Sequence, residues 1–400
     1  MNRSSVVIAL AILIIFLVAG RALPASVPTA TVPQAQVGVP HILKPPVMLL
    51  RPKEWAGLRL WPARHVESFA GGTTNPALAS YGGKLLLVEV YQGALYLSQL
   101  EPDSLKVIDK RKLSELQPGR AVNDVDAVIV KGVLWVSWIS QVVSQTLSDS
   151  RQMVLRYDLQ TASCGAPVEQ HAAVGCSLAV FSGQLWVLWR RPGPSGGLYL
   201  ARYDTTSGLG QPQQWPIQNA EWVGAGAVDL GGELFLAGIK KATLTKPPLL
   251  IKPPVIRGSA QPIPLAQPQL NTRSNSKTRQ LWAAKFNGQR FYSLRMLRGR
   301  GNFSHPACAM LDDQVITVYA SRTLAAAGAA QQSSIDITVT TGEGGEVTSA
   351  SYDSGGYNVA PDVVRMGEAL FVAYNKWSAN PASAEALNQG TYVGKIELKF

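Results

Sequence analysis

Cysteine and histidine are scarce in this chain. Three cysteines and four histidines occur in 400 residues, which excludes a small domain held together by disulfides. The histidines are scattered, and no Cys-x-x-Cys or His-Glu-x-x-His motif sets ligands at metal-binding spacing. We therefore expect no metal site. Whether Cys164 and Cys176 pair in an oxidising compartment is left open, because sequence cannot place their Cα atoms within bridging distance.

Fingerprints of the common catalytic folds are also missing. We recognise no nucleophile elbow, phosphate-binding loop or dinucleotide-binding glycine motif. The sequence therefore predicts no cofactor.

Acidic residues are absent from Leu234 to Leu311, a stretch that carries thirteen lysines and arginines. A surface of one charge sign attracts polyanions. The expected partners are an anionic polysaccharide, an envelope glycan or a protein, with contact to a membrane surface as a further option. No base-reading module is evident, which argues against nucleic acid. The predicted basic patch consists of Lys240, Lys241, Lys246, Lys252, Arg257 and Arg273.

The N-terminus has the pattern of an export signal. A short charged segment precedes the apolar run Val6–Gly20, and small residues follow it. Residues 1–25 are predicted to be a signal peptide or a helical membrane anchor, and the sequence does not decide between them. Residues 26–57 are rich in proline and suit a stalk. The chain is expected to lie outside the cytoplasm, either secreted or anchored.

A short pattern, Gly-x-Leu followed by aromatic or aliphatic residues, occurs six times with variations. Intervals of 49, 51, 49, 81 and 55 residues separate its anchor positions, and the Pro-rich insertion 245–277 accounts for the longest. The insertion is predicted to be either a basic docking arm or a tolerated surface segment. The anchor positions are Leu85, Leu134, Leu185, Leu234, Val315 and Leu370.

The repeat predicts an all-β fold. Each unit of about 50 residues has room for four short strands, as in the blade of a β-propeller. We predict a six-bladed β-propeller over residues 58–400, with four-stranded blades. The last unit ends after its third strand, so residues 58–68 are expected to supply the missing strand and close the ring. A β-sandwich is the alternative.

Functional residues are expected on the loops that enter each blade, because those loops crowd one end of a propeller channel. Arginines, carboxylates and an aromatic ring there could hold an anionic sugar. The plainer interpretation is that they are turn residues and solvated charges. The candidate binding residues are Arg120, Asp124, Glu221, Arg298, Arg300, His305 and Tyr357. Asp126 and Asp362 are further carboxylates that could serve glycoside cleavage, although strand-end roles are commoner.

Segments 305–319 and 358–364, together with the motif Ser351-Tyr-Asp-Ser-Gly355, resemble the repeats and the Asp box of sialidase-like six-bladed propellers. The resemblance spans roughly residues 70–400. It implies a propeller fold and, if activity is shared, glycoside hydrolysis. The catalytic set of that family cannot be assigned residue by residue to this chain, and a shared fold does not transfer activity.

The sequence therefore favours a non-catalytic binding or scaffolding module for an anionic envelope or extracellular partner. The alternative is an extracytoplasmic glycoside hydrolase of the sialidase-like kind. Convergence of arginines and two carboxylates at one channel mouth would favour the enzyme. The sequence decides neither the ligand nor the oligomeric state.

Overall fold

The computed structural model describes residues 52–55, 57–69, 74–142, 149–192, 197–215, 226–241, 279–322, 332–341, 346–353, 355–378 and 387–398. The chain divides into two compact units, Met1–Leu49 and Leu50–Phe400, and every described residue belongs to the second. The expected signal or anchor and most of the expected stalk lie outside the described residues. No helix in the described part of the chain is long and apolar enough to cross a membrane.

The described chain is all-β, and its strands form antiparallel sheets that follow one another along the sequence. The first sheet contains β3 (Thr74–Tyr81), β4 (Lys84–Tyr91), β5 (Ala94–Leu100) and β6 (Val107–Glu115). The second contains β7 (Arg120–Val130), β8 (Val133–Val142), β9 (Arg151–Asp158), β10 (Ser163–Cys164) and β11 (Val168–Ala172).

The next two sheets repeat this order. The third contains β12 (Cys176–Phe181), β13 (Gln184–Arg190), β14 (Leu198–Asp204), β15 (Gly208–Leu209) and β16 (Gln213–Gln214). The fourth contains β17 (Gly226–Asp229), β18 (Leu234–Lys241), β19 (Arg279–Phe286) and β20 (Phe291–Gly301). The fourth strand of the second and third sheets is split into two short strands that pair with the same neighbour.

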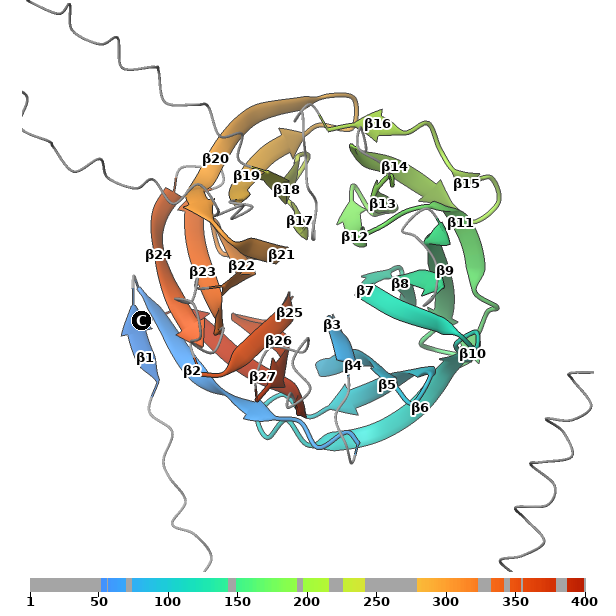
Figure 1. Cartoon of the computed structure of the whole chain (residues 1–400), viewed down its shortest axis with the longest axis horizontal. Helices are drawn as coiled ribbons and strands as arrows, with labels where there is room; N and C mark the ends of the chain where they lie inside the picture. The colour runs from blue at the N-terminus through green and yellow to red at the C-terminus, as the bar shows by residue number, and fades with distance from the viewer. Residues whose placement is uncertain are drawn as a thin grey trace, which may run out of the picture. The chain divides into compact units, whose positions relative to one another are not determined.

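A nine-stranded sheet completes the unit. Its two halves are joined through one parallel pair, Ser333 with Tyr357. One half is β21 (Phe303–Leu311), β22 (Gln314–Arg322), β23 (Ser333–Thr341) and β24 (Glu346–Asp353). The other is β25 (Tyr357–Met366), β26 (Ala369–Trp377), β27 (Asn388–Leu398), β2 (Leu58–His65) and β1 (Lys53–Trp55). Figure 1 shows one strand of each group nearest a common centre, namely β3, β7, β12, β17, β21 and β25. We call these strands the inner strands.

Two-residue turns join many of the consecutive strands. Gln92–Gly93, Lys131–Gly132 and Ser182–Gly183 all have positive φ at both positions, for example 52° and 78° at Lys131–Gly132. Such turns match the twist of the paired strands, and glycine adopts the second position without strain. At Gly132 and Gly183, the glycine of the repeat pattern is therefore the end of the turn that leads into the second strand of a sheet.

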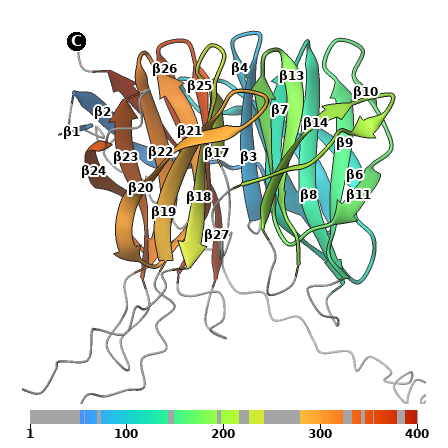
Figure 2. The same cartoon turned by 90° about the horizontal axis from the view of Figure 1, so that it is seen from above.

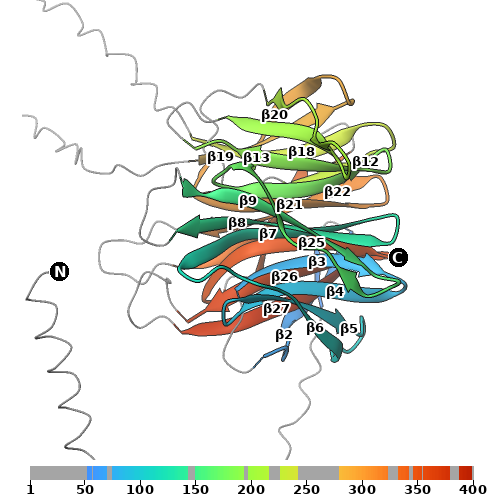
Figure 3. The same ribbon diagram turned by 90° about the vertical axis from the view of Figure 1, so that its right-hand side faces the viewer.

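The second strands are buried on both faces. In β13, Trp186 and Leu188 pack with Leu236 of the following sheet, whereas Trp189 on the opposite face packs with Val154 of the preceding one. Alternate residues of one strand therefore fill two different inter-sheet cores. Figures 2 and 3 show the strands of successive sheets standing side by side in this way.

Residues 58–65, within the segment expected to supply the missing strand of the last unit, form the strand β2 and pair with that unit. β2 pairs antiparallel with β27, bringing Leu58 opposite Leu398 and Leu60 opposite Ile396. Both leucines are at most 3% exposed, and β1 extends the sheet beyond β2. Trp61 Nε1 donates to Glu397 Oε2 at 2.7 Å. The two ends of the described chain are therefore adjacent strands of one sheet.

Candidate functional site

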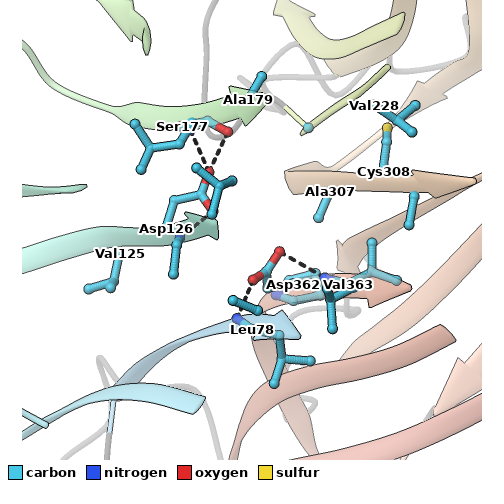
Figure 4. Close-up of a pocket in the computed structure, with 18 of the residues that line it drawn as sticks. Leu78, Val125, Asp126, Ser177, Ala179, Val228, Ala307, Cys308, Asp362 and Val363 are labelled. Atoms are coloured by element: carbon cyan, nitrogen blue, oxygen red, sulfur yellow. Dashed lines mark hydrogen bonds between the residues drawn. The ribbon is translucent and has the colours of Figure 1, made fainter. Parts of the chain in front are cut away.

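A cavity of about 430 Å³ lies among the inner strands, and all six of them contribute to its lining. We call this cavity the channel. Figure 4 shows it with side chains from several sheets pointing toward one another. Its volume is within the range of small-molecule sites.

Four inner strands enter the channel through the same irregularity. Asn75, Asp124, His305 and Ala360 have φ between 48° and 51°, and the register of each strand shifts at that point. These shifts are β-bulges, which redirect side chains and are common beside functional sites. A positive φ at a residue other than glycine costs about 1 kcal/mol or more. The surrounding sheets must offset this cost, so the bulges hold the side chains that follow in fixed directions.

One pair of polar side chains links two inner strands at these bulges. His305 Nε2 of β21 lies 3.2 Å from Asp124 Oδ1 of β7, with the side chains 27% and 13% exposed. The other ring nitrogen, Nδ1, is buried and has no hydrogen-bond partner among the described residues. The carboxylate thus orients the imidazole, and one nitrogen remains for a ligand or water.

Two further carboxyl groups, Asp126 and Asp362, line the channel two residues after bulges; we call them the carboxyl pair. Ser177 Oγ and the Leu178 N–H donate to Asp126 Oδ2, both at 2.6 Å. The Leu78 N–H donates to Asp362 Oδ2, also at 2.6 Å. Each carboxyl group thus bonds the inner strand of the neighbouring sheet (Figure 4). Asp362 bonds β25 to β3, joining the end of the repeat to its beginning.

Burial raises the pKa of both members of the carboxyl pair. The pKa of Asp362 lies well above the usual aspartate value, because of burial and then because of the charge of Asp126. The pKa of Asp126 is also raised by burial, although Ser177 and Leu178 oppose the shift. Two nearby carboxyl groups of this kind resist simultaneous ionisation. The raised pKa favours the protonated form of Asp362, and a protonated carboxyl group can act as an acid.

The described channel lining is acidic. Four aspartates contribute, Asp124, Asp126, Asp229 and Asp362, against one arginine, Arg365. Arg365 pairs with Asp312 outside the channel, at 3.7 Å. A channel of this composition disfavours an anionic ligand and tolerates an uncharged one.

Among the candidate binding residues that the structure describes, it brings together two, Asp124 and His305. Arg120 donates instead to Ser140 Oγ at 2.7 Å within its own sheet, and Arg298 on β20 donates to Ser349. Tyr357 is 1% exposed, with Arg322 over its ring. Glu221 and the side chain of Arg300 lie outside the described residues. Arg120 and Arg298 are absent from the described channel lining.

The described members of the basic patch lie on the fourth sheet. Lys240 of β18 lies over the Trp282 ring at 5.3 Å. Lys246, Lys252, Arg257, Arg273 and the side chain of Lys241 are outside the described residues. On the same sheet, Arg290 in the β19–β20 turn and Arg295 of β20 are exposed, and Leu294 and Met296 are 41% and 46% exposed.

The motif that resembles an Asp box links the two halves of the nine-stranded sheet by hydrogen bonds. Asp353 ends β24, and its carboxylate accepts hydrogen bonds from Tyr374, from Lys376 at 3.2 Å and from the Gly355 N–H at 2.8 Å. Tyr374 and Lys376 belong to β26. The motif thus joins β24 to the neighbouring half of the sheet, away from the channel lining.

The cysteines are free thiols: Cys164 is exposed, whereas Cys176 and Cys308 are buried. The pairing of Cys164 with Cys176 that the sequence left open is therefore not formed here. Cys308 lines the channel, and burial raises its pKa to about 12. Among the described residues, no cluster of three or more metal-binding side chains occurs.

Comparisons with known proteins place the fold. No family model and no curated protein sequence matches this chain. Among solved structures, YjhT is 12% identical with a TM-score of 0.50, over 82% of this chain and 99% of that one. A Trypanosoma rangeli sialidase in complex with sialic acid is 8% identical with a TM-score of 0.51, over 87% of this chain and 56% of that one. The fold is that of a sialidase-like β-propeller.

The likeness concerns the fold alone. At these identities, a shared architecture does not transfer an activity, and the chain matches little more than half the length of the sialidase. A mutant of the same sialidase that displays trans-sialidase activity matches at 8% identity and a TM-score of 0.51. The described channel lining contains one arginine, so the arginines do not converge there as expected for the sialidase-like enzyme.

Proposed function

We propose that this chain is an exported six-bladed β-propeller whose channel hydrolyses a glycosidic bond of an uncharged glycan. The observation that carries the proposal is the carboxyl pair beside the Asp124–His305 contact in one channel. Glycoside cleavage requires one protonated carboxyl group and one ionised carboxylate on either side of the bond. We count six blades because the nine-stranded sheet divides into two halves, whose strands pair at Ser333 and Tyr357, and the four other sheets are one blade each.

The roles follow from the environments of the carboxyl groups. Asp362 has the strongly raised pKa and acts as the acid, giving its proton to the glycosidic oxygen as the bond to the anomeric carbon breaks. Asp124, oriented by His305, takes a proton from the water that attacks the anomeric carbon. The acidic lining favours an uncharged sugar over an acidic one.

The test uses 4-nitrophenyl glycosides of neutral sugars, with a sialic acid glycoside as the contrasting substrate. We expect release of nitrophenol from at least one neutral glycoside. Asp362→Asn and Asp124→Asn should each lower kcat by about 100- to 10,000-fold, the usual contribution of a general acid or base. Asp313→Asn, at an exposed position in the β21–β22 turn, is the matched control.

Circular dichroism of each variant separates a lost proton transfer from a lost fold. Folded Asp124→Asn protein with full activity would contradict the assigned base. Cleavage confined to the sialic acid glycoside would contradict the uncharged substrate.

A second candidate function is binding of an anionic polysaccharide or envelope partner, and the fourth sheet supports it. Arg290 and Arg295 are exposed there beside two exposed apolar side chains, in a region of sequence without acidic residues. We expect Arg290→Gln combined with Arg295→Gln to elute from heparin resin at a lower salt concentration than wild type. The charge-matched control is Lys53→Gln with Lys131→Gln, also exposed. Equal elution of the two double variants would contradict a site on the fourth sheet.

A further inference from the structure

A second hollow, separate from the channel, lies where the second and third sheets meet. It has a volume of about 780 Å³ and is lined by β11, the end of β13 and the segment between β15 and β16. We call it the groove. Its chemistry comes from three side chains, His171, Trp189 and Arg191, and the rest of its described lining is apolar or amide-bearing.

Three polar nitrogens at the groove lack partners. Both ring nitrogens of His171 and Nε1 of Trp189 are buried without a hydrogen bond in the described part of the chain. The two rings are in contact, with centroids 4.2 Å apart. An unsatisfied buried polar atom costs about 1–3 kcal/mol, so a ligand or water that reaches these nitrogens from the groove would be stabilised by them.

Arg191 gives the groove a positive charge. Its guanidinium carbon lies 4.4 Å from the centroid of the Tyr199 ring, and Tyr199 in turn stacks on Trp189. No carboxylate pairs with Arg191 among the described residues. Stacking holds the guanidinium plane in place and leaves its N–H groups for an incoming acid.

His171 is neutral at ordinary pH. Burial and then the charge of Arg191 lower its pKa to about 4. A neutral imidazole offers one donor and one acceptor, and the Trp189 N–H offers one further donor. Hydroxyl groups both donate and accept, so they suit this set.

We propose that the groove is a second binding site that takes a carboxylate-bearing sugar, with the carboxylate on Arg191 and hydroxyl groups on His171 and Trp189. The anionic ligand that the sequence suggested for the channel loops thus has its place at this cationic groove, whereas the channel is acidic. The site is independent of the proposed hydrolysis, since none of the three side chains lines the channel.

The experiment titrates the full chain with glucuronate and, for comparison, with glucose, following Trp fluorescence and the ring signals of His171 by NMR. We expect glucuronate to bind at least about tenfold more tightly than glucose, the effect of about 1.4 kcal/mol. Bound carboxylate should also raise the pKa of His171 above its free value of about 4.

Variants locate the site. Arg191→Gln and His171→Phe should each weaken glucuronate binding about tenfold, whereas Arg202→Gln, an exposed arginine on β14, should not. His305→Gln should leave binding unchanged, because it alters only the channel. Equal binding by wild type and Arg191→Gln, or loss of binding in His305→Gln, would overturn the proposal. So would an unchanged His171 pKa at the highest glucuronate concentration, as expected if the groove holds water alone.

Discussion

Replacing Leu58 and Leu60 with alanine is expected to lower the free energy of unfolding by about 2–5 kcal/mol for each leucine. Both side chains are buried in the core formed where β2 completes the last sheet. A typical domain is stable by only about 5–15 kcal/mol, so the double variant should sit near its unfolding threshold. Chemical denaturation followed by Trp fluorescence measures the loss.

Arg64→Ala is the matched control for this experiment. Arg64 lies on the same strand but is exposed, and truncations at such positions change stability by about 0.5 kcal/mol or less. If the double leucine variant unfolds at the same denaturant concentration as Arg64→Ala, then pairing of β2 with β27 does not stabilise the ring.

Loss of the Asp362 carboxyl group should lower the free energy of unfolding by nearly as much as loss of a buried leucine. Asp362→Ala leaves the Leu78 and Val363 N–H groups without the acceptors that they have now, at 2.6 and 2.8 Å. Each unsatisfied buried donor costs about 1–3 kcal/mol. Because this bond joins β25 to β3, we expect Asp362→Ala to lower the free energy of unfolding of the whole unit and not only to disorder the residues around it. The exposed Asp313→Ala should change little, and equal stability of these two variants would count against the bond.

The stability difference between wild type and Asp362→Asn is expected to depend on pH. Because the folded pKa of Asp362 is raised, the folded chain retains a proton that the unfolded chain has released. The contribution of this group to stability is fully present below the ordinary aspartate pKa of about 4, and it falls as pH rises toward the folded pKa. Asp362→Asn cannot ionise, so its deficit relative to wild type should shrink as pH rises. A constant deficit would mean that the pKa is not raised.

The regular features of the fold follow from the sequence because they rest on local patterns. The glycine turns, such as Lys131–Gly132, and the doubly buried second strands both repeat about every 50 residues. The role of residues 58–68 follows from counting strands in the last unit. The split fourth strands, β10 with β11 and β15 with β16, leave no comparable pattern.

The sequence predicts only some of the residues that line the channel, because the inner strands contain β-bulges. A bulge shifts the alternation of a strand by one residue, so the positions that face the channel cannot be read from period-two patterning. Asp124 and His305 are found because they lie where the chain enters the first strand of a sheet, although the structure places both on the strands β7 and β21 and not on the loops that the sequence predicts. Asp126 and Asp362 look like strand-end residues. Arg120 points into its own sheet because Ser140, distant in sequence, receives its guanidinium.

The pairing of β2 with β27 has a consequence for the order of events during synthesis. A ribosome makes β2 among the earliest of the described strands and β27 after all the others, more than 320 residues later. Until the final strand emerges, the first one has no hydrogen-bonding neighbour on that side, and a contact of such long sequence separation forms slowly. The ring therefore cannot be completed before β27 has been made, and a holding factor that shields the early strand until then would raise the yield of native protein.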